Sequence, residues 1–298
     1  MKIGLIGLGK MGYNLALNLK RNGHEVIGYD VNQATLQNIS SEGIAIANSL
    51  KQLVTDLGEN RLIWLMIPAG EFVDAALSDM KPLLEKGDII IEGGNSNYKD
   101  SIRRSGEWET LGVDYLDCGT SGGPEGALHG ICAMLGGSKL AFDRMEPVIK
   151  DISQPGAYLY CGGAGSGHYV KMIHNGVEYG MMQAIAEGFE MLQKSGMNLD
   201  LAAIAGLWNH GSVVRSWLME LTEKALIKEP DLASIKGIMH SSGEGKWTLE
   251  TAMEKQIATP VIALSLIMRY RSLEDDSFAG KIVAALRNEF GGHALIKK

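Results

Sequence analysis

The sequence has little of what several classes of protein need. Its formal net charge is −7, with 28 Lys and Arg against 35 Asp and Glu, so nucleic acid is not expected as a partner. The only cysteines are Cys118, Cys132 and Cys161. Their odd number and their spacing predict reduced thiols in a cytoplasmic protein and no metal site. Met1 leads directly into an apolar segment and no apolar run is long enough to cross a bilayer, so we expect neither a signal peptide nor membrane association.

What is present begins with a glycine-rich turn. The apolar run 2–6 is followed by Gly7-Leu8-Gly9-Lys10-Met11-Gly12 and then by a helical pattern. Glycines in this spacing permit a tight turn and let backbone N–H groups approach a pyrophosphate at the start of a helix. A strand, this turn and a helix together predict a dinucleotide site.

The choice of dinucleotide depends on Asp30. This residue ends a second apolar segment, 25–29, and follows Gly12 by 18 positions. A carboxylate there accepts hydrogen bonds from ribose hydroxyls and repels a 2′-phosphate. Neither Val31 nor Asn32 supplies the cation that NADP usually requires, so we predict NAD. The alternative is that Asp30 only caps a helix beginning near Gln33.

Strand and helix patterns alternate through the first half of the chain. After the first two strands, strand patterns occupy 62–67, 88–92, 113–118, 131–135 and 157–160, and helical patterns lie between them. Such alternation predicts a parallel sheet in a Rossmann-type α/β domain. Ligands bind at the carboxyl ends of such strands. The Gly-rich loops there, at 68–70, 93–96 and 118–124, therefore predict a binding crevice.

The alternation stops at Gly162-Gly163-Ala164-Gly165, which suggests a boundary between domains 1–164 and 165–298. Beyond it the patterns are helical, at 199–208, 212–226, 232–235, 249–255, 260–271 and 277–290. We therefore expect an all-α second domain.

The most distinctive stretch is GSGHYVKMIHNGVEYGMMQ, residues 165–183. Read as a helix with Ser166 as its N-cap, it places Lys171, His174, Asn175 and Glu178 at i, i+3, i+4 and i+7, on one face. A lysine can act as a base where its surroundings lower its pKa, and Glu178 is placed to act as an acid. The alternative is a buried helix with a satisfied polar network.

Several separated motifs resemble those of the 6-phosphogluconate dehydrogenases: GLGKMG, IEGGNSNY, GTSGGPEGA, the stretch above, GKWT and RNEFGGH. The resemblance covers essentially the whole chain. It implies oxidation of 6-phosphogluconate at C3, loss of CO2 and formation of ribulose 5-phosphate, without a metal. Lys171 matches the general base of that family and Glu178 matches its general acid.

Other roles carry over by position. Residues matching substrate contacts are Asn95, Ser121, Gly122, Gly123, His174, Asn175, Tyr179, Lys246, Arg269, Arg287 and His293, with Arg271 a neighbouring alternative to Arg269. Residues matching coenzyme contacts are Gly7, Leu8, Gly9, Lys10, Met11, Gly12, Asp30, Ile67, Pro68, Ala69 and Asn95. Within the first set, Tyr179, Lys246 and Arg269 match phosphate contacts.

The resemblance also implies an oligomer, because Arg287 and His293 match tail residues that a partner subunit donates. We expect a homodimer or homotetramer. The chain looks like a short form, since common family members duplicate the helical domain. In addition, Pro124 stands where the long forms have an acidic residue.

Alternative interpretations remain at this stage. A β-hydroxyacid dehydrogenase of the 3-hydroxyisobutyrate type would share the glycine turn and the lysine motif, but would not use the phosphate-binding residues. A non-catalytic dinucleotide-binding protein would be expected to lack Lys171 or Glu178. Lys246 could be a solvated loop lysine, and Arg287 and His293 an exposed basic helix end. The sequence leaves open a role in the pentose phosphate pathway or in gluconate utilization.

Overall fold

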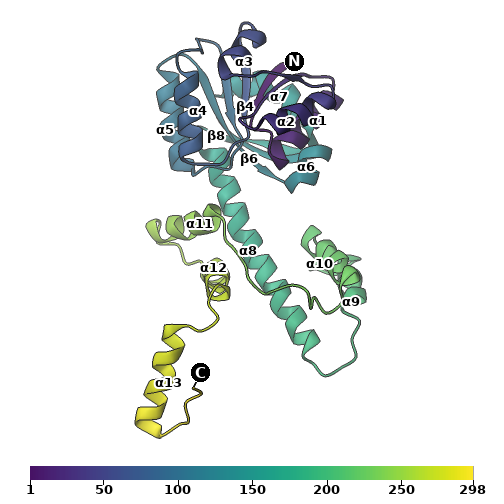
Figure 1. Ribbon diagram of the computed structural model, residues 1–298, viewed down its shortest axis with the longest axis vertical. Coiled ribbons are helices and arrows are strands. Elements are labelled where there is room, and N and C mark those ends of the chain that lie inside the picture. Colours follow the sequence, from purple (N-terminus) through teal and green to yellow (C-terminus); the bar gives the residue numbers. More distant parts are fainter. Residues whose placement is uncertain (298) are drawn as a thin grey trace. The chain divides into compact units, whose positions relative to one another are not determined.

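The computed structural model describes residues 1–297 and forms two compact units, Met1–Asn175 and Gly176–Lys298 (Figure 1). Within residues 1–297, no helix combines the length and apolar character that crossing a bilayer requires. The domain boundary between residues 164 and 165 stays a prediction.

The first unit is built on an eight-stranded sheet with the order β3-β2-β1-β4-β5-β6-β7-β8. Its strands are β1 (Lys2–Ile6), β2 (Glu25–Tyr29), β3 (Ala45–Ile46), β4 (Leu62–Leu65), β5 (Ile89–Glu92), β6 (Asp114–Ser121), β7 (Ile131–Gly137) and β8 (Ser153–Gly162). Every neighbouring pair is parallel except β6 and β7. The predicted parallel sheet is confirmed for every neighbouring pair except β6 and β7.

The β6–β7 pair departs from the expected direction because of its connection. Only the short helix α6 (Gly123–His129) and its flanking glycines lie between the two strands. A parallel neighbour needs a crossover of about a dozen residues or more, whereas antiparallel neighbours accept a short link. The chain therefore turns back at this point.

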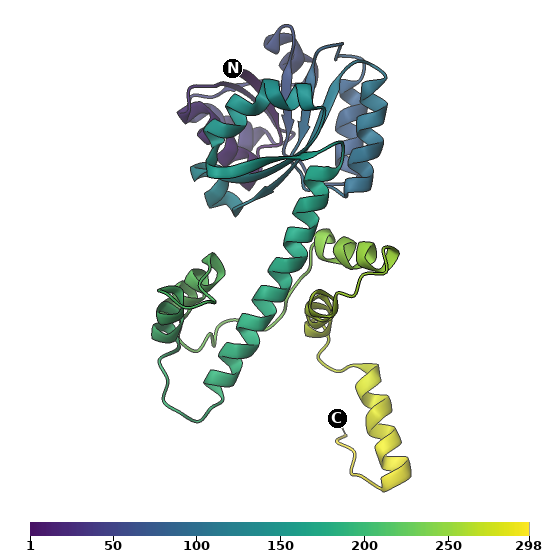
Figure 2. The ribbon, with the colours of Figure 1, turned by 180° about the vertical axis from the view of Figure 1, so that it is seen from behind.

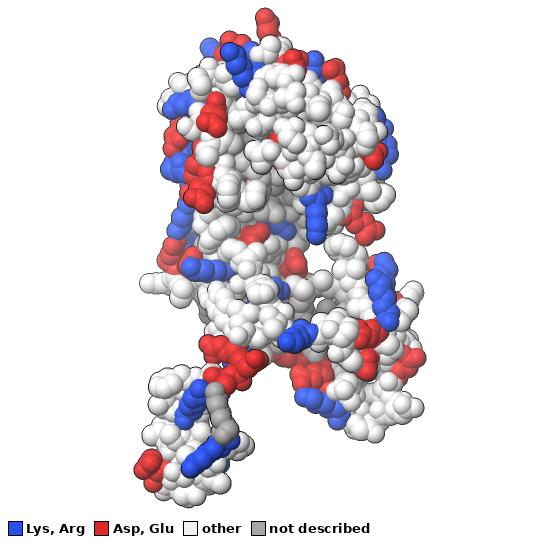
Figure 3. Space-filling view, in the orientation of Figure 1, with Lys and Arg blue, Asp and Glu red and all other residues white. Residues whose placement is uncertain are grey.

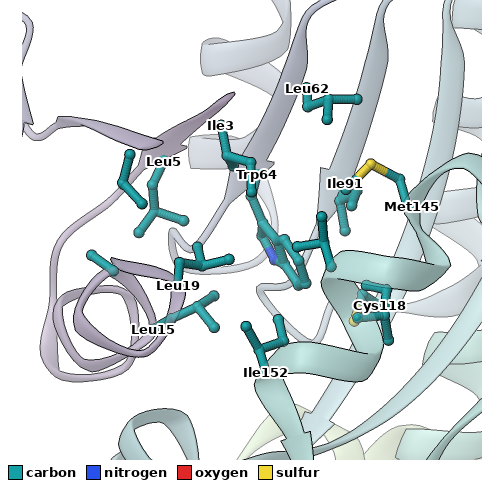
Figure 4. Close-up of a cluster of buried hydrophobic side chains, with 14 of the residues drawn as sticks. Ile3, Leu5, Leu15, Leu19, Leu62, Trp64, Ile91, Cys118, Met145 and Ile152 are labelled. Carbon is teal, nitrogen blue, oxygen red and sulfur yellow. The ribbon is translucent and has the colours of Figure 1, made fainter. Parts of the chain in front are cut away.

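Helices cover both faces of the sheet, as expected for a Rossmann-type domain (Figures 1 and 2). One apolar core joins the sheet to α1 (Lys10–Arg21), α2 (Gln33–Ser41), α6 and α7 (Lys139–Ile152). The opposite core joins it to α3 (Leu50–Leu57), α4 (Glu71–Met80) and α5 (Tyr98–Glu109). Trp64 lies fully buried in the first core, near Leu15, Leu19 and Ile152 (Figure 4).

Strand residues alternate between these two cores. Trp64 of β4 and Ile91 of β5 belong to one core, while Ile63 and Ile90 belong to the other. Both faces of each central strand are thus apolar, as parallel sheets covered on both sides require. This packing fixes the carboxyl ends of β1, β4, β5 and β6 at one edge, where the candidate site lies.

Helix α8 (Ser166–Gln193) begins in the first unit and continues into the second. The second unit also contains α9 (Leu201–Asn209), α10 (Trp217–Lys228), α11 (Gly243–Glu254), α12 (Pro260–Ser272) and α13 (Phe278–Gly291). Phe189 of α8, Ala205 of α9, and Met219 and Leu226 of α10 form a small core. The all-α expectation for this part of the chain is confirmed.

Three helix limits differ from those read from the sequence. Residues 232–235 form no helix. Helix α10 begins at Trp217 rather than near 212, because Ser216 caps it by accepting a hydrogen bond from the Met219 amide. Helix α11 begins at Gly243 instead of 249, although glycines are poor helix formers.

On the one face of the first unit that Figure 3 shows, charged side chains of both signs lie mostly around the edge. On the face shown in Figure 3, Lys and Arg lie among Asp and Glu. The described residues on this face therefore form no continuous basic patch of the kind that nucleic-acid binding proteins present.

Candidate active site

The glycine turn after β1 has the backbone that a pyrophosphate cradle needs. Gly7 has a φ of 90°, and a Cβ on Gly12 would lie 1.9 Å from the Gly7 carbonyl oxygen. Gly9 precedes α1, where no side chain caps the helix and no acidic residue occupies its first turn. An added Cβ on Gly9 would meet no atom within 4 Å. Two glycines thus permit close packing, and the helix N-terminus stays open to an anion.

Asp30 is tied to this turn. Its Oδ2 accepts a 2.7 Å hydrogen bond from the Leu8 amide, and its Oδ1 accepts one of 2.8 Å from the Asn32 amide. The interpretation that Asp30 only caps α2 is wrong, because Asn32 is the N-cap and accepts a hydrogen bond from Ala34. The Asp30 carboxylate therefore lies beside the glycine turn, where a dinucleotide ribose would be recognised.

The other residues predicted to contact the coenzyme lie at the same edge of the sheet. Leu8 is buried, whereas Lys10 is exposed and Met11 is half-buried on the first turn of α1. Ile67, Pro68 and Ala69 follow β4, next to β1 in the sheet. A Cβ on Gly7 would lie 2.6 Å from Cγ2 of Ile67, so the two loops pack closely together.

The polar residues at the start of α8 form a hydrogen-bonded group. Nζ of Lys171 donates a 2.7 Å hydrogen bond to Oδ1 of Asn175 and lies 3.4 Å from Nδ1 of His174. That Nδ1 lies 3.0 Å from the same Oδ1, and Nε2 lies 3.4 Å from Oγ of Ser121. In the tautomer that carries its proton on Nδ1, the ring donates to Oδ1 of Asn175 and its Nε2 can accept from Ser121. Lys171 is only 5% exposed.

Asn95 comes from the loop after β5 and reaches the neighbouring strand. Its side-chain amide donates to the Thr120 carbonyl at 3.3 Å, and its Oδ1 accepts from the Thr120 amide at 3.0 Å. Asn95 has a φ of 56°, a left-handed conformation that Asn tolerates better than most residues. The strained loop and strand β6 thus hold the Asn95 amide in one orientation.

Strand β6 brings the other predicted residues to this edge. A Cβ on Gly119 would lie 2.3 Å from Cβ of Lys171, so only glycine permits the helix to come this close. Gly122 and Gly123, with φ values of 114° and 60°, begin α6 directly after Ser121. Pro124 follows in its first turn. Ser121, Gly122 and Gly123 therefore lie beside the Lys171 group.

Cys118 lies on β6 but is fully buried. Burial, with a further contribution from the charge of Asp117, raises the pKa of its thiol well above the usual value. Thiolate is the reactive form of cysteine, so Cys118 is an inert core residue.

The second unit holds another part of the predicted site. The guanidinium carbon of Arg269 lies 3.4 Å from the centroid of the Tyr179 ring, and Nη1 donates a hydrogen bond to the His240 carbonyl. The Tyr179 hydroxyl lies 3.0 Å from Oγ of Ser242 and accepts from the Ser242 amide at 2.9 Å. Arg271 instead donates to the Glu274 carbonyl. The structure thus associates Arg269, not Arg271, with Tyr179.

Four predicted residues remain outside these two groups. Glu178 is half-buried, two turns beyond Lys171 on α8. Lys246 lies on helix α11 and not in a loop, but its side chain is solvated as the alternative expected: it is 62% exposed, and its Nζ is 3.5 Å from Glu250. Arg287, near the end of α13, and His293, just beyond it, are exposed. Within residues 1–297, neither has a hydrogen bond to Tyr179 or Arg269.

Three residues that were not among the predicted site residues make contacts that position neighbouring segments: Asp117, Glu92 and His168. Asp117 accepts hydrogen bonds from the amides of Gly165 and His168 at the start of α8. Ser166 was expected to cap this helix, but its Oγ is buried without a hydrogen-bond partner in the described chain. Glu92 and His168 lie beneath the site, both fully buried. His168 continues the polar stripe of α8 by one turn toward its N-terminus, a signal that the sequence contained.

Comparison with known proteins shows the family of the chain. Residues 2–163 match the family profile described as the NAD binding domain of 6-phosphogluconate dehydrogenase. Residues 167–294 match the 6-phosphogluconate dehydrogenase C-terminal domain. The chain belongs to the 6-phosphogluconate dehydrogenase family.

Individual relatives span different lengths of this family. YqeC of Bacillus subtilis (strain 168), provisionally named a 6-phosphogluconate dehydrogenase, is 58% identical over 100% of both chains. The NAD(+)-dependent, decarboxylating 6-phosphogluconate dehydrogenase of Haloferax volcanii is 42% identical over 100% of this chain and 99% of its own. The solved structure of Plasmodium falciparum 6-phosphogluconate dehydrogenase matches with 33% identity and a TM-score of 0.86. That match covers 100% of this chain but 66% of the other. The match therefore extends over nearly the whole length of the first two relatives and over about two thirds of the Plasmodium falciparum chain.

Proposed function

We propose that the protein catalyses oxidative decarboxylation of 6-phospho-D-gluconate to D-ribulose 5-phosphate and CO2, with reduction of NAD. The observation that carries this proposal is the buried amine of Lys171, oriented by Asn175 and grouped with His174 and Ser121. An oriented lysine beside hydroxyl-binding and carboxylate-binding groups suits an enzyme that removes a proton from a sugar-acid hydroxyl.

In this mechanism Lys171 is the general base. Its neutral amine takes the proton of the C3 hydroxyl while hydride leaves C3. Bound NAD supplies the hydride acceptor. The ammonium of Lys171 then polarises the new C3 carbonyl, which takes up the electron pair of the breaking C1–C2 bond as CO2 departs. Glu178 finally protonates C2, which completes ribulose 5-phosphate.

The substrate is held at two ends. Asn95, Ser121, Gly122, Gly123, His174 and Asn175 hold its carboxylate and hydroxyls, with Asn95 also beside the nicotinamide. Tyr179, Lys246 and Arg269 hold the phosphate. Support for the phosphate role comes from the guanidinium of Arg269, which is oriented by the Tyr179 ring and the His240 carbonyl. Guanidinium groups form charge-assisted hydrogen bonds with phosphate oxygens.

NAD rather than NADP is the proposed coenzyme. The Asp30 carboxylate lies beside the glycine turn, where it would repel a 2′-phosphate. The Haloferax volcanii relative, which spans the same length, is named as NAD(+)-dependent. Gly7, Leu8, Gly9, Lys10, Met11 and Gly12 would hold the pyrophosphate, and Ile67, Pro68 and Ala69 would border the coenzyme.

The working enzyme is a homodimer or homotetramer in which Arg287 and His293 complete the partner's site. Support comes from α13, which carries both apolar surface and Arg287 but contains no buried residue. Phe278 and Phe290 are 75% and 77% exposed. Such an apolar helix is expected to be covered by another protein surface, and the family resemblance favours a second copy of this chain.

The β-hydroxyacid dehydrogenase interpretation is less well supported. A small acid without phosphate has no use for a guanidinium held in a fixed position against Tyr179. A non-catalytic role leaves the orientation of Lys171 by Asn175 without a purpose.

The decisive test is turnover by the purified protein. We expect reduced coenzyme and CO2 in equal amounts from 6-phosphogluconate with NAD, and slower reaction with NADP. Gluconate without the phosphate and 3-hydroxyisobutyrate serve as control substrates. Turnover of 3-hydroxyisobutyrate without CO2, and none of 6-phosphogluconate, would contradict the proposal.

A further inference from the structure

Glu92 is a buried carboxylate at the end of β5 to which the proposed mechanism gives no role. It is 0% exposed. Its Oε1 accepts a 2.7 Å hydrogen bond from the Gly94 amide. Its Oε2 lies 3.6 Å from Nη1 of Arg104, 3.6 Å from Nδ1 of His168 and 3.5 Å from the Tyr115 hydroxyl. A charge taken out of water at this depth is costly unless it is paired and hydrogen-bonded.

One oxygen of this carboxylate holds the loop that carries Asn95. The hydrogen bond from the Gly94 amide lies at the end of β5, two residues beyond Glu92. A Cβ on Gly94 would lie 2.8 Å from Oε1 of Glu92 and 2.4 Å from the Ile67 carbonyl oxygen. Gly94 is therefore pressed between Glu92 and the neighbouring loop. Asn95 is the next residue in the chain, so the fixed position of Gly94 restricts the backbone of Asn95.

The other oxygen faces the start of α8. His168 is 1% exposed, and its Nδ1 lies 2.8 Å from Oγ of Ser101 as well as near Glu92. Its Nε2 is buried without a hydrogen-bond partner among residues 1–297. The ring orientation is therefore set on its Nδ1 side. His168 and Lys171 are three residues apart on α8, so they lie on the same face, one turn from each other.

Arg104 of α5 connects this carboxylate to a third element. Its guanidinium, 1% exposed, donates to Oγ of Ser96 at 3.1 Å, to the Gly70 carbonyl at 3.1 Å and to Asp74 at 2.8 Å. Ser96 closes the loop that begins at Gly93. Glu92 thus contacts this loop at Gly94, and Arg104 contacts it at Ser96.

We propose that Glu92 is a positioning residue that fixes the Asn95 loop and the Lys171 turn of α8 to one common anchor. The Glu92 carboxylate then sets the relative placement of the Asn95 amide and the Lys171 amine together with the Thr120 contacts of Asn95 and the Asp117 contacts of α8. The consequence for catalysis rests on the roles given to Asn95 and Lys171 under the proposed function. The mechanical coupling of the two segments does not depend on those roles.

The test compares Glu92→Gln with Asp88→Asn in the full-length protein. Asp88 is also 0% exposed and immediately precedes the same strand; it pairs with Arg61 at 3.0 Å. The control therefore removes a buried charge of the same kind without touching the loop or α8. Steady-state kinetics and amide hydrogen exchange are measured on both variants and on the wild type.

For Glu92→Gln we expect kcat to fall about 10-fold to 100-fold, because small displacements of the reacting groups slow the chemical step by factors of this size. KM for 6-phosphogluconate and NAD should change by less than roughly threefold, because the proposed phosphate contacts Tyr179, Lys246 and Arg269 and the glycine turn at residues 7–12 are untouched. Exchange should become faster in residues 93–97 and 166–172 together. Asp88→Asn should leave kcat and exchange in both segments unchanged, even if it lowers the melting temperature.

Two results would overturn the proposal. One is faster exchange in residues 93–97 with unchanged exchange in 166–172, because the two segments would then not share an anchor. The other is a kcat that falls no more than that of Asp88→Asn. If Glu92→Gln does not fold, His168→Asn is used in its place. For His168→Asn, a wild-type kcat together with unchanged exchange in residues 166–172 would contradict the proposal. Absence of turnover in the wild type would refute the proposed function, while the exchange measurements would still decide the role of Glu92.

Discussion

Nζ of Lys171 donates a 2.7 Å hydrogen bond to Oδ1 of Asn175, one turn further along α8. The same Oδ1 lies 3.0 Å from Nδ1 of His174. One amide oxygen thereby orients both the proposed base and the imidazole that lies next to Ser121. The helix repeat places these groups together, so the sequence spacing alone was sufficient to find them.

Replacement of Lys171 by Met should abolish the proton transfer while keeping the shape of the side chain. We expect kcat to fall by about 10²-fold to 10⁴-fold, the usual contribution of a positioned base. NAD affinity, measured by calorimetry, should stay unchanged because the glycine turn is separate from Lys171. Lys194→Met, an exposed lysine just beyond α8 that pairs with Glu190, is the matched control. Wild-type kcat in Lys171→Met would contradict the assignment.

Asp30 should decide between the two coenzymes. In Asp30→Ala the repulsion of the 2′-phosphate disappears. The ratio of kcat/KM with NADP to that with NAD should therefore rise about 10-fold or more, which corresponds to a free-energy difference of at least about 1.4 kcal/mol. Asp30→Asn removes the charge, but its amide oxygen can still accept the hydrogen bond from the Leu8 amide. This variant therefore tests the effect of the charge separately from the effect of the hydrogen bond. An unchanged ratio in both variants would show that specificity lies elsewhere.

Arg269 should matter for the phosphate, and Arg271 should not. Both lie in the last turn of α12, but only Arg269 contacts Tyr179. We expect Arg269→Met to raise KM for 6-phosphogluconate by about 10-fold to 100-fold, because a hydrogen bond to a charged group contributes about 1.5–3 kcal/mol. Arg271→Met is the control, and equal KM values for the two variants would remove Arg269 from the phosphate site.

Local patterns account for the part of the fold that the sequence predicted. The strand runs, the glycine turn and the stripe of α8 are set by residues close together in the chain, so their periodicity can be read directly. Strand β3 was missed because Ala45–Ile46 is too short to show any period. The antiparallel β7 follows from the length of a connection rather than from the pattern of the strand itself.

The remaining features depend on contacts between distant segments. Helix α11 begins at Gly243 against the propensity of its glycines, and a Cβ on Gly245 would lie 2.5 Å from the Tyr179 ring. Here packing against α8 overrides local preference. The association of Glu92 with Arg104 and His168 likewise joins β5, α5 and α8. No spacing rule within one element could have indicated it.

The Asp74–Arg104 pair should give stability a defined dependence on pH. Hydrogen bonds from Arg104 and then Arg103 hold the pKa of Asp74 below its usual value of 3.8. A lowered pKa means that the stabilisation is present above about pH 3.8 and is lost as pH falls through the folded-state value. Asp74 is 43% exposed, and solvent screening limits such pairs to about 1 kcal/mol.

Asp74→Asn should therefore lower the urea midpoint slightly at pH 7. The difference from the wild type should shrink as the pH falls below 3.8, because the wild-type carboxyl then becomes neutral as well. Asp143→Asn, which removes an exposed carboxylate paired with Lys139, is the control for general charge effects. A difference that stays constant down to the lowest pH would mean that Asp74 acts through its shape and hydrogen bonds, and not through its charge.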